Sequence, residues 1–132
     1  TGSIIVIIGT DLPLLPIQLR RIAKRAAIGI GRTGTPGGNY SGDIFLAFSI
    51  ANDIGLPNRD AEQPLNYALN YINDHYFDDI YSATVQAIEE AIINAMIAAE
   101  SMTTIKPPGY TVAAIDHDRL KQIMKQYNRL SE

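Results

Sequence analysis

The sequence predicts a layered α/β fold, and three observations support this class. Short apolar segments rich in β-branched residues alternate with longer segments of helical periodicity, in the order β-α-β-α-α-β-α. The first two strand segments are apolar on both faces, which is typical of strands that lie between two layers. Three strands are fewer than the roughly four to six of a usual sheet. We therefore expect an α/β layered piece that strands from elsewhere complete.

The composition describes a globular chain and argues against several kinds of partner. Its 132 residues are 46% hydrophobic and 19% charged, which fits a single domain over residues 1–132 and not a disordered chain. The net charge of −3 gives no reason to expect nucleic acid or an anionic membrane as a partner. The absence of cysteine excludes disulfides and thiolate zinc sites. The apolar run Ile4–Ile8 is too short to cross a bilayer and lacks the basic start of a secretory signal, so we expect a cytoplasmic protein.

The N-terminal segment predicts a strand followed by a helix. Ile4–Ile8 is short, apolar and β-branched, as expected of a covered strand. Thr10 or Asp11 as a capping side chain, followed by Pro13, predicts the start of a helix that ends near Gly29–Gly31. The apolar side of this helix holds Leu15, Leu19, Ile22, Ala23, Ala26, Ala27 and Ile30. The opposite side is basic, and we interpret it as a solvated surface and not as an anion site; it carries Arg20, Arg21, Lys24 and Arg25.

The middle of the chain predicts a loop, a second strand and a helical region. Residues 32–42 contain four glycines and a proline, which indicates a loop. Residues 43–50 are mostly apolar on both faces and predict a strand. After a polar connection over residues 52–63, apolar residues at helical spacing predict a helix from Pro64, interrupted around residues 73–79.

The C-terminal part predicts one more strand and one more helix. The long helical region ends near Ala99, and Pro107–Gly109 is a firm stop. Tyr110–Ile115 then predicts a last strand. Asp116 or Asp118 caps an amphipathic helix whose apolar side holds Leu120, Ile123, Met124 and Tyr127.

Two hydroxyl residues precede the first strand and suggest nucleophilic catalysis. Thr1 and Ser3 stand before a covered strand with no initiator Met, as in a chain from which an upstream segment has been removed. When Ser or Thr is the first residue, its own α-amine, which titrates near about pH 7.7–8.0, can act as the base that activates the hydroxyl. An ordinary polar strand start, a tag remnant or a trimmed chain gives the same pattern, and position alone favours the ordinary start.

A second polar group lies at the entry to the second strand. Ser41 and Asp43 are two residues apart, so in an extended chain they share a face. If the strands at Ile4 and Ile44 are neighbours, these side chains meet Ser3 at one end of the sheet. A hydroxyl and a carboxylate there can orient the amine and stabilise its protonated form. Ser, Gly and Asp are also common turn residues, and by itself this group indicates a turn.

Four segments, in order, resemble one family of hydrolases. They are GSIIVIIGTD at residues 2–11, PLLPIQL at 13–19, IGIGRTG at 28–34 and SGDIFLAFS at 41–49. Together they resemble the small, nucleophile-bearing subunit of the L-aminopeptidase/D-esterase and β-peptidyl aminopeptidase family (peptidase family S58), with the nylon-oligomer hydrolases as more distant relatives. The resemblance is strong through residue 50 and weaker beyond it. Four linked segments are far more specific than any one of them.

The resemblance implies a fold, a reaction and a set of site residues. The fold is a four-layer αββα sandwich of the N-terminal-nucleophile type. The precursor cleaves itself before the nucleophile, and the larger N-terminal subunit stays with this one, usually in a tetramer of such pairs. The nucleophile falls on Ser3, with cleavage between Gly2 and Ser3, and the supporting hydroxyl and carboxylate fall on Ser41 and Asp43. The implied substrates are short peptides, amino-acid amides or esters with a free amino terminus; no cofactor and no metal is implied.

The sequence departs from the family pattern at two places. Gly9 and Gly31 stand where Ala is expected, at a cost in local rigidity. Thr1 and Gly2 precede Ser3, so Ser3 has a free amine only once they are removed. Spacing favours Ser3 as the nucleophile, with Thr1 as the alternative. The second hypothesis is acyl transfer of the ornithine acetyltransferase type with Thr1 as nucleophile, or a non-catalytic relative that stays uncut.

Other motifs are rejected as sites. The glycines at 29, 31 and 34 match the spacing of the dinucleotide fingerprint, but that fingerprint needs a strand before it and a helix after it, and here a helix comes first. The acidic cluster over residues 74–79 has metal-ligand residue types, but we interpret it as a solvated helix start. His117, between two candidate capping residues, is interpreted as a surface residue.

Overall fold

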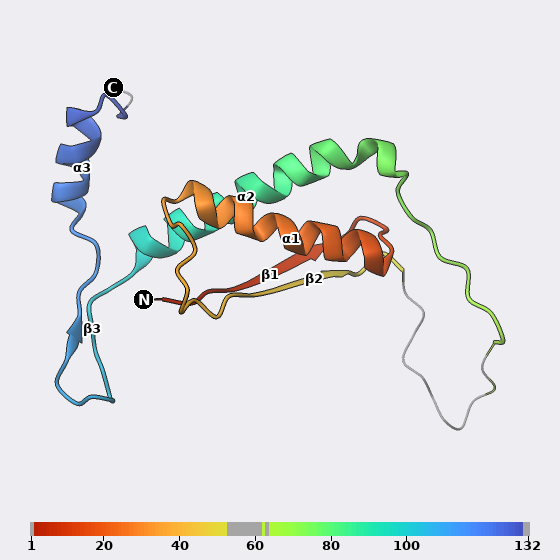
Figure 1. Cartoon of the computed structure of the whole chain (residues 1–132), viewed down its shortest axis with the longest axis horizontal. Helices are drawn as coiled ribbons and strands as arrows, with labels where there is room; N and C mark the ends of the chain where they lie inside the picture. The colour runs from red at the N-terminus through yellow and green to blue at the C-terminus, as the bar shows by residue number, and fades with distance from the viewer. Residues whose placement is uncertain (1, 53–61, 63, 131–132) are drawn as a thin grey trace. The chain divides into compact units, whose positions relative to one another are not determined.

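The structure is a computed structural model that describes residues 2–52, 62 and 64–130 (Figure 1). Contacts divide the chain into two compact units, residues 1–89 and 90–132. The alternation of strands and helices confirms the predicted α/β class. The elements are β1 (Ile5–Thr10), α1 (Pro16–Arg32), β2 (Ile44–Ser49), a 3₁₀ turn η1 (Asp74–Tyr76), α2 (Phe77–Ala98), β3 (Met102–Thr103), β4 (Thr111–Val112) and α3 (His117–Gln126).

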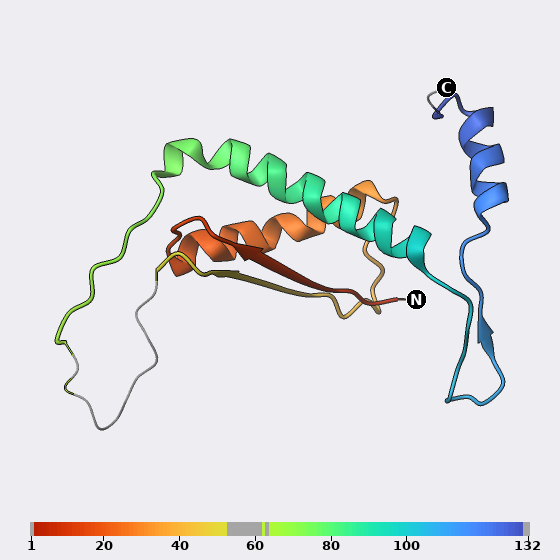
Figure 2. The same ribbon diagram turned by 180° about the vertical axis from the view of Figure 1, so that it is seen from behind.

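Strands β1 and β2 form a parallel pair in which Ile5 lies opposite Ile44. One face of the pair packs against α1 and the start of α2, which lie on the same side of the strands in both views (Figures 1 and 2). The other face, which we call the open sheet face, holds large apolar side chains that are 45–69% exposed: Ile5, Ile7, Ile44, Leu46 and Phe48. Within residues 1–89, helices therefore cover one face of the pair, and the expected cover of the other face by another part of the protein stays a prediction.

The core of residues 1–89 lies where α1 and the start of α2 meet the covered sheet face. Leu14, Ile22 and Phe77 are only 2–4% exposed and form its centre. Partly buried apolar side chains pack around them: Ile8, Leu12, Leu19, Ala47, Ile72, Ile80 and Tyr81. The core thus joins the first strand, both helices and the segment before α2 into one packed unit.

Helix α1 begins later than predicted, at Pro16. A proline suits the first helical position, and Leu15 N–H donates to Gln18 Oε1 at 3.0 Å, as in half of a capping box. The predicted cap, Thr10, instead accepts from Leu12 N–H through its Oγ1 at 3.1 Å. This local turn competes with helix formation and delays the helix start.

Gly29 lies where α1 and α2 come close together. A Cβ atom at position 29 would meet the Cβ and Cγ2 of Ile88 at 2.9 Å and the carbonyl oxygen of Val85 at 3.0 Å. Gly29 therefore permits close helix packing. The helix continues to Arg32, one residue beyond the predicted end near Gly29–Gly31. At Gly31, by contrast, a Cβ atom would have no neighbour within 4 Å.

The Gly29→Ala variant is expected to destabilise the packing of α1 on α2 by about 1 kcal/mol. Overpacking costs about 1–3 kcal/mol, and the higher helix propensity of Ala offsets about 1 kcal/mol of it. The matched variant Gly31→Ala gains propensity without the clash and is expected to stabilise by about 0.5–1 kcal/mol. Thermal unfolding of the assembled protein, with amide hydrogen exchange along α1, measures both effects. Equal shifts in the two variants would contradict tight packing at Gly29.

Residues 33–43 form the predicted loop between α1 and β2. Gly34 and Gly37 have φ angles of 100° and 70°, in the left-handed region that favours glycine. The predicted polar connection over residues 52–63 lies outside the described residues, except at positions 52 and 62. The loop is the segment that leads directly to the start of β2.

The predicted helix over residues 64–72 is wrong, since this segment contains no helix. The backbone of this segment bonds to distant residues instead. Asn70 N–H donates to Asn52 Oδ1 at 3.0 Å, and Asn52 Nδ2 donates to Asn70 O at 2.9 Å. Ile72 N–H donates to Pro13 O at 3.0 Å. These long-range bonds satisfy groups that a helix would have paired locally, and the leucines at the expected apolar positions are exposed.

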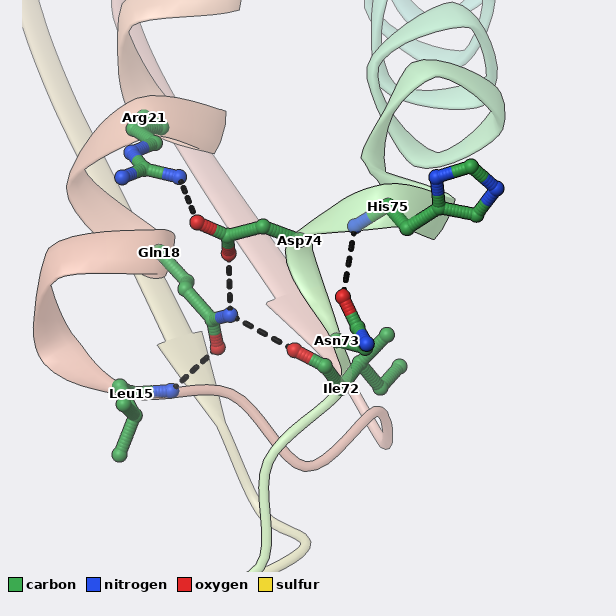
Figure 3. A network of polar contacts seen from close by, with 7 residues as sticks. All are labelled: Leu15, Gln18, Arg21, Ile72, Asn73, Asp74 and His75. Carbon is green, nitrogen blue, oxygen red and sulfur yellow. Dashed lines mark hydrogen bonds and ion pairs between the residues drawn. The ribbon is translucent and has the colours of Figure 1, made fainter.

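A polar network joins the first turn of α1 to the segment before α2 (Figure 3). Gln18 is 2% exposed, and its Oε1 accepts from Leu15 N–H. Its Nε2 donates to Ile72 O and to Asp74 Oδ1, both at 2.8 Å. Arg21 Nη1 donates to Asp74 Oδ2 at 2.7 Å. Asp74, which the sequence suggested to be solvated, is exposed but uses both carboxylate oxygens in this network.

Asp74 links this network to the pH dependence of stability. The pKa of Asp74 is lowered because Gln18 donates to the carboxylate and Arg21 pairs with it, and the same contact raises the pKa of Arg21. A carboxyl group whose folded pKa is depressed contributes stability above its unfolded value of about 3.9. That stability is lost as the pH falls through the lower folded value.

We therefore expect Asp74→Asn to flatten the fall in melting temperature below about pH 4, by a small amount because the ion pair is exposed. The control is Asp78→Asn, because the Asp78 carboxylate has no hydrogen-bond or ion-pair partner among the described residues. This variant is expected to show the same fall in melting temperature at low pH as the parent protein. Melting temperatures between about pH 2 and 6 measure the difference. An unchanged acid limb in Asp74→Asn would contradict the assignment.

The second unit contains a short antiparallel hairpin of β3 and β4. Met102 lies opposite Val112, and Thr103 lies opposite Thr111. The predicted strand over residues 110–115 is therefore real but shorter, and the sequence missed β3. A strand of two residues is too short for its periodicity to be recognised.

Helix α3 is capped by Asp116, one of the two predicted candidates. Its Oδ1 accepts from Arg119 N–H at 2.9 Å, whereas Asp118 lies inside the first turn. His117 is exposed, as predicted, and its Nε2 lies 2.9 Å from the carbonyl oxygen of Ile97. Across the described part of the chain, every helix is too short or too polar to span a membrane.

Candidate active site

The parallel pairing of β1 and β2 brings the predicted site residues to one end of the strands. Because Ile5 lies opposite Ile44, the residues just before the two strands are also neighbours. Ser3 therefore lies beside the segment that carries Ser41 and Asp43. This is the juxtaposition that the sequence predicted on the condition that the two strands were neighbours.

At this end, side chains replace the backbone ladder. Ile44 N–H donates to Ile4 O at 3.0 Å, so an evenly spaced parallel ladder would next take Gly42 N–H to Gly2 O. Gly42 N–H instead donates to Ser3 Oγ at 2.9 Å. The first site contact is therefore a backbone donor aimed at the side-chain oxygen of Ser3.

The Asp43 carboxylate forms the other half of the cluster. Its Oδ1 accepts from Ile4 N–H at 3.0 Å and from Ser41 Oγ at 2.5 Å. The Ser41 hydroxyl thus donates its hydrogen bond to Asp43, and its oxygen lone pairs remain available to accept from another donor. Ser41 is half-buried, whereas Ser3 and Asp43 are exposed. A carboxylate and an oriented hydroxyl consequently lie next to the backbone of Ser3.

The chemistry of the cluster depends on the bond before Ser3. The nitrogen of Ser3 belongs to the Gly2–Ser3 peptide bond, so it cannot act as a base. Cleavage of that bond would create an α-amine on the same residue as the hydroxyl, which is the arrangement of an N-terminal nucleophile. Thr1, the alternative nucleophile, lies outside the described residues.

The basic side of α1 is used for packing as well as for solvation. Arg21 belongs to the network of Figure 3. The Arg25 guanidinium lies 3.9 Å from the centroid of the Tyr81 ring, a cation–π contact. Arg32 Nε pairs with Glu89 at 2.6 Å. These contacts join α1 to η1 and α2, so this side of the helix is not merely solvated.

The structure also shows whether possible metal ligands come together. Nowhere in the described residues do three His, Asp or Glu side chains come together as metal ligands, and this includes the acidic cluster at 74–79.

Sequence reasoning missed Gly42 as a site residue, because it acts through its backbone N–H and not through a side chain. A strand register that pairs Ser3 with position 42 was the only available signal.

Known sequences resemble the chain along most of its length. A profile of the family described as Peptidase family S58 matches residues 1–108. The β-peptidyl aminopeptidase BapA of Sphingosinicella microcystinivorans is 45% identical over 134 residues, which cover 98% of this chain and 31% of that protein.

Solved structures give the same result. The L-aminopeptidase D-Ala-esterase/amidase of Ochrobactrum anthropi, described as a new variant among the Ntn hydrolase fold, has a TM-score of 0.86 and 51% identity over 98% of this chain and 35% of that chain. A β-aminopeptidase from Burkholderia sp. has a TM-score of 0.82 and 36% identity over 94% of this chain and 35% of that chain. The chain spans about a third of the length of these relatives. The predicted N-terminal-nucleophile type of fold is confirmed, and the chain belongs to peptidase family S58.

Proposed function

We propose that this chain is the nucleophile-bearing part of a self-processing aminopeptidase. The observation that carries the proposal is the grouping of Ser3, Ser41 and Asp43 at one end of the parallel strands, where Ser3 Oγ accepts from Gly42 N–H and Asp43 Oδ1 accepts from Ser41 Oγ and Ile4 N–H. Membership of a peptidase family and likeness to named aminopeptidases support it. The cluster contains a nucleophile, a carboxylate and a hydroxyl, which are the groups that such a reaction needs.

In the proposed reaction, cleavage between Gly2 and Ser3 frees the α-amine of Ser3. The amine takes the proton of Ser3 Oγ, and Oγ attacks the carbonyl carbon of an amide or ester. The leaving amine or alcohol departs with a proton from the ammonium, and an acyl-enzyme remains. Water then attacks the ester and returns Ser3 to its starting state. Asp43 stabilises the ammonium form of the amine, and Ser41, bonded to Asp43, orients it.

The proposed partner is a larger N-terminal subunit of the same precursor. The chain would be the C-terminal part of that precursor, a single domain over residues 1–132. The open sheet face supports this proposal, since large apolar side chains that are 45–69% exposed require a cover. A second sheet from the partner, with its own helices beyond, would give the four-layer αββα sandwich. We further propose a tetramer of such pairs, located in the cytoplasm.

The proposed substrates are short peptides, amino-acid amides and esters that carry a free amino terminus. The support is chemical as well as comparative. The relatives are named for β-peptidyl aminopeptidase, L-aminopeptidase and D-Ala-esterase/amidase activities. An acidic side chain beside the nucleophile, Asp43, is also compatible with a cationic substrate amine.

Intact mass and N-terminal sequencing of the protein expressed from its full-length gene test the proposal. We expect two chains that stay together, the smaller beginning at Ser3, and hydrolysis of amino-acid anilides. A small chain that begins at Thr1 would keep the mechanism but move the nucleophile. One uncut chain after long incubation, without hydrolysis, would refute self-processing and favour the non-catalytic relative.

A further inference from the structure

We infer that the backbone N–H of Gly42 is a catalytic hydrogen-bond donor to the nucleophilic oxygen, and that it acts mainly on release of the acyl group from Ser3. The inference rests on the proposed function, in which Ser3 Oγ is the nucleophile. Its basis is the 2.9 Å contact from Gly42 N–H to Ser3 Oγ.

The position of the donor is fixed by its neighbours in the sheet and not by the loop before it. Ile44 N–H is held by Ile4 O at 3.0 Å, and Asp43 Oδ1 is held by Ile4 N–H at 3.0 Å. Gly42 lies between these anchors and the loop, opposite Ser3 in the strand register. The Gly42 N–H, which in a regular ladder would bond to Gly2 O, therefore already points at Ser3 Oγ. Such a preorganised donor needs no reorganisation during the reaction.

The donor affects the two halves of the reaction differently. In acylation it eases removal of the hydroxyl proton, but it also lowers the nucleophilicity of the oxygen, and these effects oppose each other. In deacylation the amine takes a proton from the attacking water. The C–Oγ bond then breaks, its electron pair returns to Oγ, and the ammonium delivers the proton there. The Gly42 N–H stabilises the negative charge that develops on Oγ in this step, so deacylation gains most.

The absence of a side chain at position 42 permits a clean comparison of variants. A Cβ atom there would lie 3.5 Å from Ser3 Oγ, an ordinary van der Waals contact, and Gly42 does not have a positive φ angle. Ala at this position keeps the N–H donor, whereas Pro removes it. Replacement of the Ser41–Gly42 peptide bond by an ester removes the same N–H with no change of side chain.

The test uses the assembled two-chain protein and one acyl group presented as a p-nitrophenyl ester and as a p-nitroanilide. The intact mass of quenched samples gives the amount of acyl-enzyme, and peptide mapping locates the adduct on Ser3. In Gly42→Pro and in the ester-backbone variant we expect deacylation to slow by about 10- to 100-fold, with a smaller change in acylation, so that acyl-enzyme accumulates. Gly42→Ala is expected to keep the parent ratio of deacylation to acylation.

The outcomes separate this inference from the function on which it rests. Slower deacylation with accumulated Ser3 adduct in both donor-free variants supports it. If both variants release the acyl group as fast as Gly42→Ala, the donor role is refuted while the proposed function stands. If Gly42→Pro does not fold, the ester-backbone variant alone decides. If the parent protein never forms a Ser3 adduct, the proposed function fails and this inference with it.

Discussion

The Ser3→Ala variant of the full precursor is expected to stay uncut and to lose about 10³-fold or more of its amidase activity. The alanine removes the oxygen that is proposed to attack both the Gly2 carbonyl and a substrate carbonyl, and loss of a nucleophile has effects of at least this size. The backbone register of β1 and β2 from Ile5–Ile44 onward does not involve Oγ, so the variant is expected to keep it. Gel analysis of processing and initial rates with an amino-acid p-nitroanilide measure the two losses.

Two further variants make the result specific to Ser3. Ser82→Ala changes an exposed serine on α2 that makes no hydrogen bond within the described residues, and it is expected to process and hydrolyse normally. Thr1→Ala is expected to remain active, since spacing places the nucleophile at Ser3. If Thr1→Ala is inactive and Ser3→Ala retains activity, the nucleophile assignment is reversed and the acyltransferase-type hypothesis gains. Comparable activity in all three variants would refute an N-terminal nucleophile.

The side chains of the candidate site could be predicted from the sequence because they follow from the strand register. Ser41 and Asp43 share a face by the two-residue period of a strand, and the parallel pairing of Ile5 with Ile44 brings them to Ser3. The backbone donor of Gly42 could not be predicted in this way. Every residue except proline carries an N–H, so only the exact end of the ladder distinguishes this one.

The fold was predictable where the apolar periodicity of a segment reflects burial. It was not predictable where long-range backbone hydrogen bonds determine the conformation of a segment. The apolar stripe of α1 includes the buried residues Ile22, Ala26 and Ile30, as expected of a helix that packs on one side. The segment over residues 64–72 has the same spacing, but its backbone pairs with Asn52 and Pro13. Side-chain periodicity contains no information about such long-range partners, so the helix prediction failed there.

The open sheet face explains a second difference between prediction and structure. Strands that are apolar on both faces indicate two covering layers, and the described chain supplies one. The apolar side chains on the open sheet face are those that the proposed partner subunit would cover. The same reasoning accounts for the small number of strands, because two strands pair among the described residues of the unit that carries the site.

The Gln18→Leu variant is expected to destabilise the protein by about 2–3 kcal/mol. Leu has a similar size, but it can neither accept from Leu15 N–H nor donate to Ile72 O and Asp74, which Gln18 does with three hydrogen bonds. Each buried polar group left without a partner costs about 1–3 kcal/mol, partly offset by the added apolar surface of leucine. Thermal unfolding of the assembled protein gives the loss, and faster amide hydrogen exchange in the first turn of α1 locates it.

Two further variants show whether the loss of stability comes from the hydrogen-bond network or from replacing any glutamine by another residue. Gln86→Leu changes an exposed glutamine of α2 that has no hydrogen-bond partner in the described part of the chain, and it is expected to shift stability by less than about 0.5 kcal/mol. Gln18→Glu keeps an acceptor for Leu15 N–H but sets a second carboxylate against Asp74, where the Gln18 amide now lies 2.8 Å from Oδ1. Its loss of stability should therefore diminish as the pH falls and one carboxyl is protonated, opposite to the behaviour of the parent. A Gln18→Leu protein as stable as Gln86→Leu would mean that the network of Figure 3 does not anchor the start of α1.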